Sequence, residues 1–546
     1  MSTITETTDA AANSSTTYQM GVGDDFYGSL DPQTSDWIAV TLTQGQTYSI
    51  GSVGIGTKGS GLTDPLLVLH DADGNLLAAS NNDGPGKFAT ITTTVATTGT
   101  YYVEVSSLTA TAPGDYGLVL TEGDKPSFGV EMGAAILYRP NVTWADAPHT
   151  AATVTWGIRS EGLTTDASGN AAPFFQLTAA QIATAQAVLA NYSDVANLTI
   201  VQQNPGGTSN DATILMGGYS SGKDGAGAFA YYPDNTDPAA HAGDLWLNDK
   251  YVQTDELPLG SYSYFVFLHE LGHTMGLAHP GDYNAAPGVK ITFNNSAQFQ
   301  QDSEQYSVMS YFHADATDKG APDVYAQTLM MYDIYALQQM YGVNHNARAT
   351  DTTYGFNATE GGAYDFSVNK IPLMCIWDGG GTDTLDLSGF HKAQRIDLND
   401  GAFSDVAGYT NNLSIALGAI IENAVGGTKA DAMTGNDANN RLLGGKGDDT
   451  ISGQAGDDHF IGNGGADSFV FTTGFGTDYI KDFNTAKDML VLDAELWGGG
   501  VKTAAEVIHD FASVVGGELV LDFGISEIVF KNLGSAHGLE SQILFA

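Results

Sequence analysis

A nine-residue repeat in the C-terminal part of the chain limits its fold more than any other feature. From Gly426 the sequence divides into five consecutive segments, GGTKADAMT, GNDANNRLL, GGKGDDTIS, GQAGDDHFI and GNGGADSFV. The sixth position is Asp or Asn and the eighth is apolar in all five. This period is typical of a parallel β-roll, in which each segment supplies one short strand with an apolar residue facing the core. A flexible Gly/Asp linker would not keep that residue in phase.

The same repeat supplies the oxygen ligands that Ca²⁺ prefers. Glycines allow tight turns that aim backbone carbonyl groups inward, and the sixth position adds a hard anionic oxygen. Because stacked carboxylates repel one another, we expect the roll to be unstable without calcium. The predicted calcium ligands within the repeats are Gly427, Asp431, Asn440, Gly444, Gly445, Gly447, Asp449, Gly456, Asp458, Gly465 and Asp467.

A second segment, FLHELGHTMGLAH, places three histidines and a glutamate within a short run. Residues four apart on an α-helix lie about 40° apart on one face, so His269 and His273 can hold one ion. Glu270 lies beside that ion, where it can act as general base on a metal-bound water. Gly276 can take a positive φ and end the helix, which lets His279 return to the metal.

Three imidazole ligands with an open fourth position are typical of catalytic zinc rather than of a structural site. Such a zinc ion lowers the pKa of its bound water toward 7 and polarises a carbonyl oxygen. Histidines of an ordinary helix are the alternative, but they do not explain the fixed offsets of Gly276 and His279.

The rest of the chain shows three further patterns. Short alternating runs such as DWIAVTLT and TYYVEVSS, separated by Gly, Asp and Asn turns, predict a β-sandwich. Helical spacing at 177–195 and 327–342, with strands between them, predicts an α+β region around the histidines. We therefore expect a multidomain protein with a disordered tail or short pro-segment (1–17), a β-sandwich (18–122), an α+β catalytic domain (127–345) and a C-terminal parallel β-roll/β-sandwich (346–546).

Composition excludes several classes of function. The 63 acidic and 20 basic residues give a formal net charge of −43, which argues against binding nucleic acid or an anionic membrane and favours a monomer. The single cysteine, Cys375, cannot form an intrachain disulfide. No apolar stretch reaches the length of a membrane span, and the first residues lack the pattern of a signal peptide.

The motif from His269 to His279, followed by YSVMSYF, resembles the metzincin peptidases, and HPGDYN with MSY resembles their serralysin branch. The resemblance implies a zinc endopeptidase with a metzincin fold. It implies that Met309 is the Met-turn residue, an apolar floor beneath the metal. It also implies that Tyr311 is an extra zinc ligand that can swing away and stabilise the oxyanion.

The resemblance extends beyond the motif. GAFAYYP is similar to the family's edge strand, which implies that Ala228, Phe229, Ala230 and Tyr231 receive the substrate as an added β-strand. IWDGGGTDTLDLSGF, IIENAVGG and TDYIKDFNTAKDMLVLD resemble the ends of the family's calcium roll. They imply the further calcium ligands Asp378, Gly380, Gly381, Asp383, Glu422, Asp478 and Asp488.

The resemblance also implies a route of export. Serralysin-like proteins leave Gram-negative bacteria by type I secretion through an uncleaved C-terminal signal, which fits the terminal ESQILFA. The 18–122 region looks like a bacterial pre-peptidase C-terminal module, which minimal serralysins lack. Its HDADGN loop (70–75) is either a calcium site or an ordinary turn.

Together these features predict a secreted endopeptidase with one catalytic zinc and several structural calcium ions, acting on protein or peptide substrates. Two alternatives remain open. One is a calcium-dependent surface or matrix-binding protein with a vestigial zinc site. The other is a dedicated processing protease for a surface-layer protein, with the front sandwich as its recognition module.

Overall fold

The computed structural model describes the whole chain except residues 1, 33, 57–60, 63, 82–87, 109–113, 139–141, 163–169, 224, 234–241, 254 and 287. The chain forms two compact units. The first contains Met1–Thr317 and Thr328–Asn344, and the second contains Asp318–Gln327 and His345–Ala546. Strands far outnumber helices in the described residues, and the longest sheet among them, of nine strands, lies in the second unit.

The first unit begins with two five-stranded sheets that enclose one apolar core. Alternation is clear in β4 (Asp36–Leu42), where Ile38, Val40 and Leu42 point into this core. The first sheet has the order β1 (Thr3–Thr5), β3 (Asp25–Leu30), β10 (Gly114–Glu122), β5 (Thr47–Gly54) and β8 (Phe88–Thr94). The second has the order β2 (Gln19–Met20), β4 (Asp36–Leu42), β9 (Gly99–Ser107), β6 (Pro65–His70) and β7 (Leu76–Asn81).

The N-terminal segment, residues 2–17, differs from the disordered tail predicted for it. β1 pairs in parallel with β3, so that Thr3 lies opposite Asp25. The hydroxyl of Tyr18 accepts hydrogen bonds from the amides of Thr7 at 2.8 Å and Thr8 at 3.0 Å. Polar contacts hold this segment in place, so it does not need the apolar periodicity that its sequence lacks.

The HDADGN loop of the sandwich closes on itself. One carboxylate oxygen of Asp71 accepts the amides of Asp73 at 3.0 Å and Asn75 at 2.8 Å. The side-chain amide of Asn75 donates to both carboxylate oxygens of Asp71. These bonds are those of an ordinary Asx turn, one of the two interpretations of this loop.

Residues that join the sandwich to the following helices are also held in place. The ammonium group of Lys125 donates to the carbonyl of Ala297 at 2.6 Å. The buried ring of Phe128 packs edge-on against Phe88 from β8 and against Phe299, with centroids 6.1 and 5.6 Å apart. The residues between the predicted sandwich and catalytic domains are therefore part of a packed junction inside the first unit.

A mostly parallel sheet forms the centre of the remaining part of the first unit. Its order is β13 (Leu198–Gln202), β11 (Ala152–Ile158), β14 (Ile214–Tyr219), β16 (Leu245–Asn248) and β15 (Ala228–Ala230), with β12 (Phe174–Phe175) paired to β14. β15 runs antiparallel to β16 at the end of this order. The helices are α1 (Val130–Leu137), α2 (Ala179–Val195), α3 (Tyr262–Thr274), α4 (Phe293–Ser296), η1 (Ala314–Ala316) and α5 (Met331–Tyr341).

Both predicted helices are present, with shorter starts. α2 begins after Thr178, which forms a capping box with Gln181. α5 begins at Met331 because the carboxylate of Asp333 accepts the amide of Met330 at 2.9 Å and caps the helix there. No helix in the described ranges is long and apolar enough to cross a membrane.

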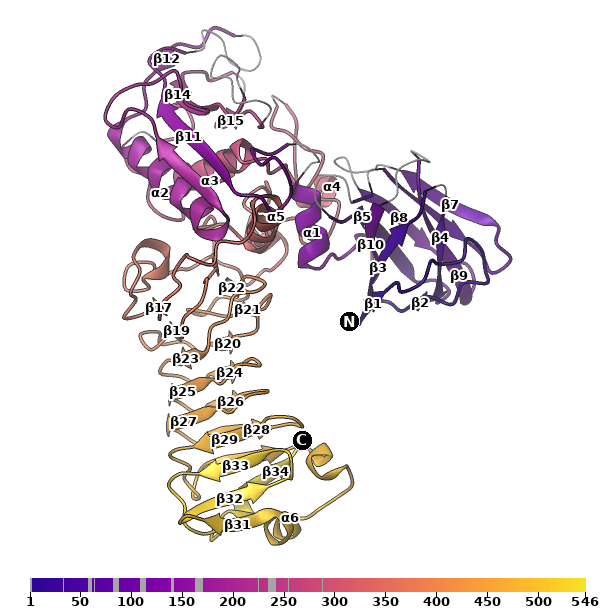
Figure 1. Cartoon of the computed structure of the whole chain (residues 1–546), viewed down its shortest axis with the longest axis vertical. Helices are drawn as coiled ribbons and strands as arrows, with labels where there is room; N and C mark the ends of the chain where they lie inside the picture. The colour runs from indigo at the N-terminus through magenta and orange to yellow at the C-terminus, as the bar shows by residue number, and fades with distance from the viewer. Residues whose placement is uncertain are drawn as a thin grey trace. The chain divides into compact units, whose positions relative to one another are not determined.

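The second unit is a stack of short strands that Figure 1 shows in orange and yellow. One sheet has the order β17 (Thr353–Gly355), β19 (Thr384–Asp386), β23 (Asn423–Val425), β25 (Arg441–Lys446), β27 (His459–Gly464), β29 (Thr477–Ile480), β33 (Glu527–Phe530), β32 (Glu518–Asp522) and β31 (Ala512–Val515). A second has the order β20 (Arg395–Asp397), β24 (Ala432–Thr434), β26 (Thr450–Ser452), β28 (Ser468–Phe471), β30 (Met489–Leu492) and β34 (Ile543–Phe545). β18 (Met374–Ile376), β22 (Leu413–Ile415) and β21 (Phe403–Ser404) form a small third sheet, and α6 (Ala504–Phe511), η2 (Gly362–Tyr364), η3 (Ala494–Trp497) and η4 (Glu540–Gln542) complete the unit.

The nine-residue repeats alternate between the two long sheets. Met433, Ile451 and Phe469 lie in one sheet, and Leu442 and Phe460 lie in the other. All five side chains are at most 2% exposed, so the eighth position of each repeat faces the core as predicted. Two repeats, 18 residues, therefore make one full coil of the roll.

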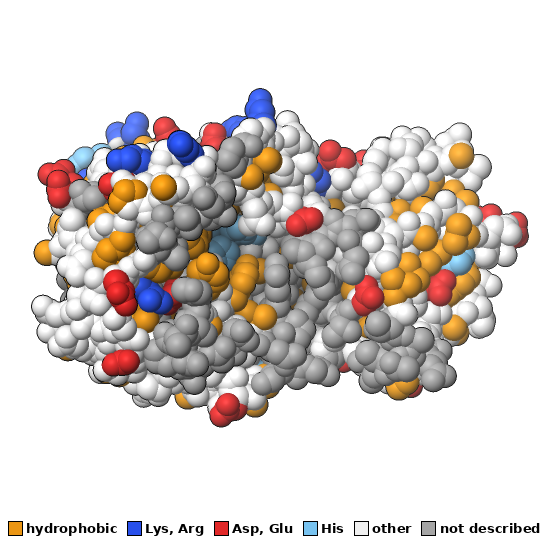
Figure 2. Space-filling view, turned by 90° about the horizontal axis from the view of Figure 1, so that it is seen from above, with side chains coloured by type: hydrophobic (Ala, Val, Ile, Leu, Met, Phe, Trp, Pro, Cys, Tyr) orange, Lys and Arg blue, Asp and Glu red, His pale blue; other side chains and the backbone are white. Residues whose placement is uncertain are grey.

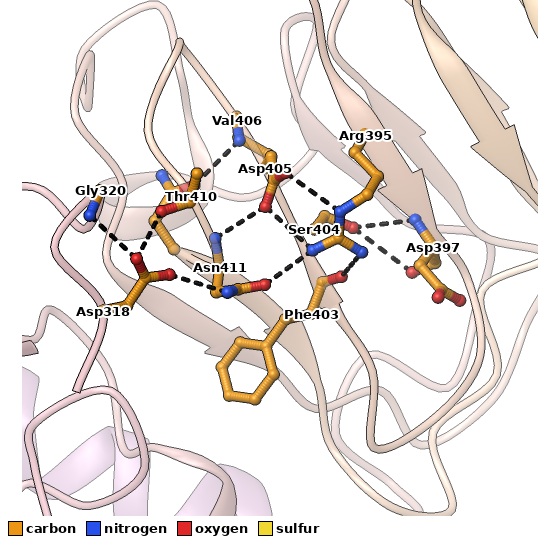
Figure 3. A network of polar contacts seen from close by, with 11 residues as sticks. Asp318, Gly320, Arg395, Asp397, Phe403, Ser404, Asp405, Val406, Thr410 and Asn411 are labelled. Atoms are coloured by element: carbon orange, nitrogen blue, oxygen red, sulfur yellow. Dashed lines mark hydrogen bonds and ion pairs between the residues drawn. The ribbon is translucent and has the colours of Figure 1, made fainter. Parts of the chain in front are cut away.

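The short segment Asp318–Gln327 packs with the second unit, although it falls inside the region predicted as the catalytic domain. The carboxylate of Asp318 accepts hydrogen bonds from the hydroxyl of Thr410 at 2.8 Å and the side-chain amide of Asn411 at 2.7 Å. Arg395 donates to the same Asn411 at 2.7 Å and pairs with Asp405, as Figure 3 shows. Contacts with residues distant in sequence thus place this segment in the second unit, although the residues on either side of it belong to the first.

Candidate active site

Helix α3 and the turn that ends it carry the histidine motif. The amide of Gly276 donates to the carbonyl of His273 at 3.0 Å, and the amide of Leu277 donates to that of Gly272 at 2.9 Å. This is a Schellman motif, which requires a left-handed residue after the helix. Gly276 has φ of 100°, and a Cβ there would lie 2.3 Å from the carbonyl oxygen of Val142. The predicted glycine turn is therefore present, and no other residue fits it.

Each of the three histidines is oriented by a backbone carbonyl. The Nδ1 atoms of His269, His273 and His279 lie 2.8, 2.7 and 2.9 Å from the carbonyl oxygens of Val308, Leu277 and Tyr283. A carbonyl only accepts, so each Nδ1 carries the proton and each Nε2 presents a lone pair. The turn after α3 contains Leu277, whose carbonyl orients His273. The same turn brings His279 back toward the other two histidines.

The three Nε2 atoms converge on one point. The Nε2 of His279 lies 3.1 Å from the Nε2 of His269 and 3.1 Å from that of His273. Because none of these atoms carries a proton, the lone pairs repel one another unless a cation lies between them. Nitrogen ligands of a tetrahedral zinc ion, at about 2.0–2.1 Å, are about 3.3 Å apart. The residues present therefore fit a zinc ion.

The surroundings of the histidines are apolar. The three side chains are 6–8% exposed. Burial lowers the pKa of His269 to about 4, which keeps its ring neutral and able to bind a metal. In the space-filling view, histidine side chains appear inside a hollow bordered by hydrophobic side chains (Figure 2).

Glu270 lies on α3 between His269 and His273 in sequence, and the ring of Tyr311 lies against the rings of two of the histidines. Glu270 is 8% exposed, and burial raises its pKa to about 8. The ring of Tyr311 lies 4.5 Å from that of His279 and 5.5 Å from that of His269, between centroids. Burial, with the charge of Glu270, raises the pKa of Tyr311 well above its usual value, so its hydroxyl stays protonated and able to donate.

Met309 lies under helix α3. It is fully buried, and a Cβ on Gly272 would lie 2.4 Å from its sulfur, so the helix packs directly on this side chain. The turn that carries it is anchored by Asp333, whose carboxylate accepts the hydroxyl of Ser307 at 2.7 Å and the amide of Val308 at 2.8 Å. Since Val308 orients His269, Asp333 supports the site from α5. Sequence reasoning missed this residue, because a lone Asp inside an apolar helix gives no local signal.

A second buried carboxylate was also missed. Asp302 accepts hydrogen bonds from the hydroxyls of Tyr283 and Ser310, each at 2.8 Å. The carbonyl of Tyr283 orients His279, and Ser310 precedes Tyr311 in the chain. Asp302 therefore links the segments that hold two predicted site residues. The sequence QDSEQ around it reads as an exposed polar loop, which hid this role.

The predicted substrate strand lies at the edge of the sheet. β15 contains Ala228, Phe229 and Ala230, and Tyr231 follows it. The amide of Tyr231 donates to Asp244 and the carbonyl of Gly227 accepts from Asn248, both at 2.9 Å. Alternate residues of an antiparallel strand bond to the same side, so the polar backbone groups of Ala228 and Ala230 point away from β16.

The position-six residues of the roll form two ladders. The amide of Asp431 donates to the carboxylate of Asp449, and that of Asp449 to Asp467, at 2.8 and 3.0 Å. The second ladder joins Asn440 to Asp458 and Asp458 to Asp478, at 2.7 and 2.9 Å. Asp488 extends the first ladder by accepting the amide of Asp467 at 3.1 Å. The structure thus brings the predicted position-six ligands into two columns, and successive members of one column are 18 to 21 residues, one coil, apart in sequence.

Each ladder leaves carboxylate oxygens without a partner. The Oδ2 atoms of Asp449, Asp458 and Asp478 are buried and accept no hydrogen bond. Burial raises the pKa of Asp449 and Asp458 to about 7 and that of Asp478 to about 9. Columns of buried carboxylates with spare oxygens suit a hard cation such as Ca²⁺. Gly447 and Gly456 have positive φ angles in the turns between strands, and Gly445 has a positive φ within β25.

The predicted ligands at the start of the roll also come together. Asp383 accepts the amide of Thr352 at 2.7 Å and leaves its second carboxylate oxygen buried without a partner. Its own amide donates to Glu422 at 2.7 Å. Asp378 accepts the amide of Gly380 at 2.7 Å. Gly380 and Gly381 have φ of 139° and 146°, which only glycine adopts readily. Gly427 and Gly465 lie between strands, whereas Gly444 lies within β25, next to the carboxylate of Asp449.

Several known proteins are similar to this chain over most of its length. Residues 343–529 match the family model described as Peptidase M10 serralysin C terminal. The chain is 40% identical over 449 residues to metallopeptidase AprA of Pseudomonas marginalis, covering 77% of this chain and 92% of that protein. It is 40% identical over 378 residues to serralysin of Photorhabdus laumondii, covering 64% and 78%. Serralysin G of Dickeya chrysanthemi is 36% identical over 332 residues, covering 59% and 67%.

One solved structure matches a smaller part. The pre-peptidase C-terminal domain of a collagenase from Bacillus anthracis is 20% identical, covering 19% of this chain and 93% of that domain with a TM-score of 0.15. The relatives above share their similarity over most of the chain at 36–40% identity. The chain therefore belongs to the serralysin family of metzincin peptidases and is a metalloendopeptidase.

Proposed function

We propose that this chain is a secreted endopeptidase in which His269, His273 and His279 hold one zinc ion. The convergence of three unprotonated Nε2 atoms, with that of His279 lying 3.1 Å from each of the other two, carries this proposal. When bound, zinc supplies a Lewis acid that acidifies water and polarises the carbonyl of the scissile peptide. The substrates are proteins or peptides.

Two side chains perform the proton transfer and charge stabilisation. Glu270 takes a proton from the attacking water and delivers it to the nitrogen of the leaving amine. Its burial supports this role, since desolvation raises the pKa of this carboxyl group and so increases the affinity of the carboxylate for a proton. The hydroxyl of Tyr311 donates a hydrogen bond to the oxyanion that develops on the carbonyl oxygen. Met309 supports the metal ligands from below.

Metal removal tests this function. A zinc chelator should abolish casein hydrolysis, and one added zinc per chain should restore it. Metal analysis by mass spectrometry, with casein zymography on the same samples, measures both quantities. Casein hydrolysis that continues in protein stripped of zinc would contradict the assignment.

The edge strand β15 supports a mode of substrate binding. The outward backbone groups of Ala228 and Ala230 can hydrogen bond to an extended peptide that adds to the sheet as a further strand. Phe229 and Tyr231 lie beside these groups along the same segment. Main-chain recognition of this kind tolerates many substrate sequences.

A proline at Ala228 tests this binding mode. Ala228→Pro removes one outward amide without removing a bond to β16, so KM for a peptide substrate should rise by about tenfold with little change in kcat. Ala228→Ser, which keeps the amide, is the matched control. Steady-state kinetics on a fluorogenic peptide gives both constants, and an unchanged KM in Ala228→Pro would argue against strand addition.

We further propose that residues 346–546 form a calcium-binding roll that stabilises the enzyme, and that 127–345 and 18–122 are the catalytic and front β-sandwich domains. The ladders with spare carboxylate oxygens support the roll. Export by type I secretion, through a signal at the C-terminus, fits a roll that folds only in extracellular calcium.

A further inference from the structure

Asp302 is a buried carboxylate near the three histidines, and the proton transfers proposed above give it no part. It is 1% exposed. The hydroxyls of Tyr283 and Ser310 both donate to its Oδ1 atom, at 2.8 Å each. Burial of a carboxylate is unfavourable unless hydrogen bonds compensate, and hydrogen bonds to a charged acceptor are stronger than neutral ones. Asp302 therefore fixes the positions of these two hydroxyls.

Tyr283 connects Asp302 to Tyr311. The ring of Tyr283 lies 4.9 Å from that of Tyr311, between centroids, and the backbone amide of Tyr311 donates to the Tyr283 hydroxyl. The same ring stacks on that of His279, with centroids 5.5 Å apart. The side chain that Asp302 holds thus contacts both the ring and the backbone of Tyr311.

Ser310 provides a second connection between the same two residues. It directly precedes Tyr311 in the chain. Its hydroxyl donates to Asp302 and accepts the amide of Phe312 at 3.1 Å. The backbone on both sides of Tyr311 is therefore tied to one carboxylate oxygen, and Tyr311 cannot shift along the cleft while these bonds persist.

The hydroxyl of Tyr311 is held by the segment that Tyr283 begins. The backbone amide of Ala285, two residues after Tyr283, donates to this hydroxyl. An amide group can only donate through its nitrogen, so it occupies a lone pair of the phenol oxygen and leaves the phenol proton for another acceptor. The Tyr311 hydroxyl is thus oriented as a donor, which is what a developing oxyanion requires.

We propose that Asp302 and Tyr283 are positioning residues that hold the hydroxyl of Tyr311 where it donates to the oxyanion. This inference rests on the proposed function, in which Tyr311 makes that donation. It assigns Asp302 an effect on kcat that passes through Tyr311, although Asp302 itself bonds to Tyr283 and Ser310.

A double-mutant cycle in the full, metal-loaded chain tests this proposal. Tyr283→Phe removes one hydroxyl and keeps the ring, and Asp302→Asn keeps the shape of the side chain while removing its charge. Because a small displacement of a catalytic group is costly, each should lower kcat for a fluorogenic peptide by about tenfold. KM and the zinc content should not change. In a Tyr311→Phe background, the same substitutions should change kcat by less than about twofold.

Tyr251→Phe is the matched control, since Tyr251 is 43% exposed and precedes α3 in a loop. It should leave kcat unchanged in both backgrounds. Equal losses of kcat with and without the Tyr311 hydroxyl would show a general structural role for Asp302 and Tyr283, and would overturn the proposal. An unchanged kcat in both Tyr283→Phe and Asp302→Asn would overturn it as well.

The cycle also separates this inference from the function on which it rests. If Tyr311→Phe alone keeps the wild-type kcat, the proposed role of Tyr311 is wrong and the inference is overturned with it. If Tyr311→Phe lowers kcat but the effects of the two substitutions simply add to that loss, the role of Tyr311 stands and only the positioning role is wrong.

Discussion

Glu270→Ala should lower kcat/KM for casein by about 10³-fold while one zinc per chain stays bound. Glu270 is not one of the three converging ligands, so its loss leaves the metal cradle intact. General acid–base catalysis by a placed side chain contributes about 10²- to 10⁴-fold, and 10³-fold corresponds to about 4 kcal/mol of transition-state stabilisation. Steady-state kinetics together with metal analysis of the same preparation measures the effect.

Glu256→Ala is the matched control, since Glu256 is an exposed glutamate in the loop before α3. It should keep both its zinc and its activity. If Glu270→Ala retains zinc and still cleaves casein at the wild-type rate, Glu270 is not the base. If zinc and activity disappear together, Glu270 serves to hold the metal instead.

Calcium removal should unfold the roll. Buried carboxylates in the two ladders, among them Asp449, Asp458 and Asp478, have spare oxygens that a cation must satisfy. Binding free energy at such sites is folding free energy, and each site held at 100 times its Kd contributes about 2.7 kcal/mol. The binding free energy lost from several sites together exceeds the free energy of unfolding of an ordinary domain. Excess calcium chelator should therefore abolish exchange protection across residues 423–492, and added calcium should restore it.

A pair of substitutions separates ligand loss from general charge effects. Asp458→Asn removes a carboxylate from the second ladder and should raise the calcium midpoint for roll protection. Asp437→Asn, an exposed change in the neighbouring repeat, should not. Full protection of the roll in chelator would show that its fold does not depend on a metal.

Much of the active site could be predicted because its signals are local. The offsets of His269, His273, Gly276 and His279 describe one helix and one turn, and backbone geometry then determines where the imidazoles meet. The roll is similar, because each repeat contains its own glycine turn, its carboxylate or amide and its core residue. In both cases about a dozen neighbouring residues or fewer contain the whole pattern.

The unpredicted features depend on contacts between distant residues. Asp333 supports His269 from a helix more than 60 residues later in the chain. The carboxylate of Asp302 looks like part of a solvated loop until the fold places Tyr283 and Ser310 against it. Residues 2–17 have no apolar pattern, and partners on β3 and Tyr18 hold them. The residues around each of these positions do not indicate which distant residues they will contact.

The ladders also set the lengths that the roll can adopt. Asp431, Asn440 and Asp449 each find their acceptor 18 residues later. An insertion of nine residues would send every later repeat to the opposite sheet and break both columns. An insertion of 18 would leave both columns continuous. We therefore expect repeats to be gained or lost in whole coils, whereas turns between strands can take a few extra residues, as between Asp458 and Asp478.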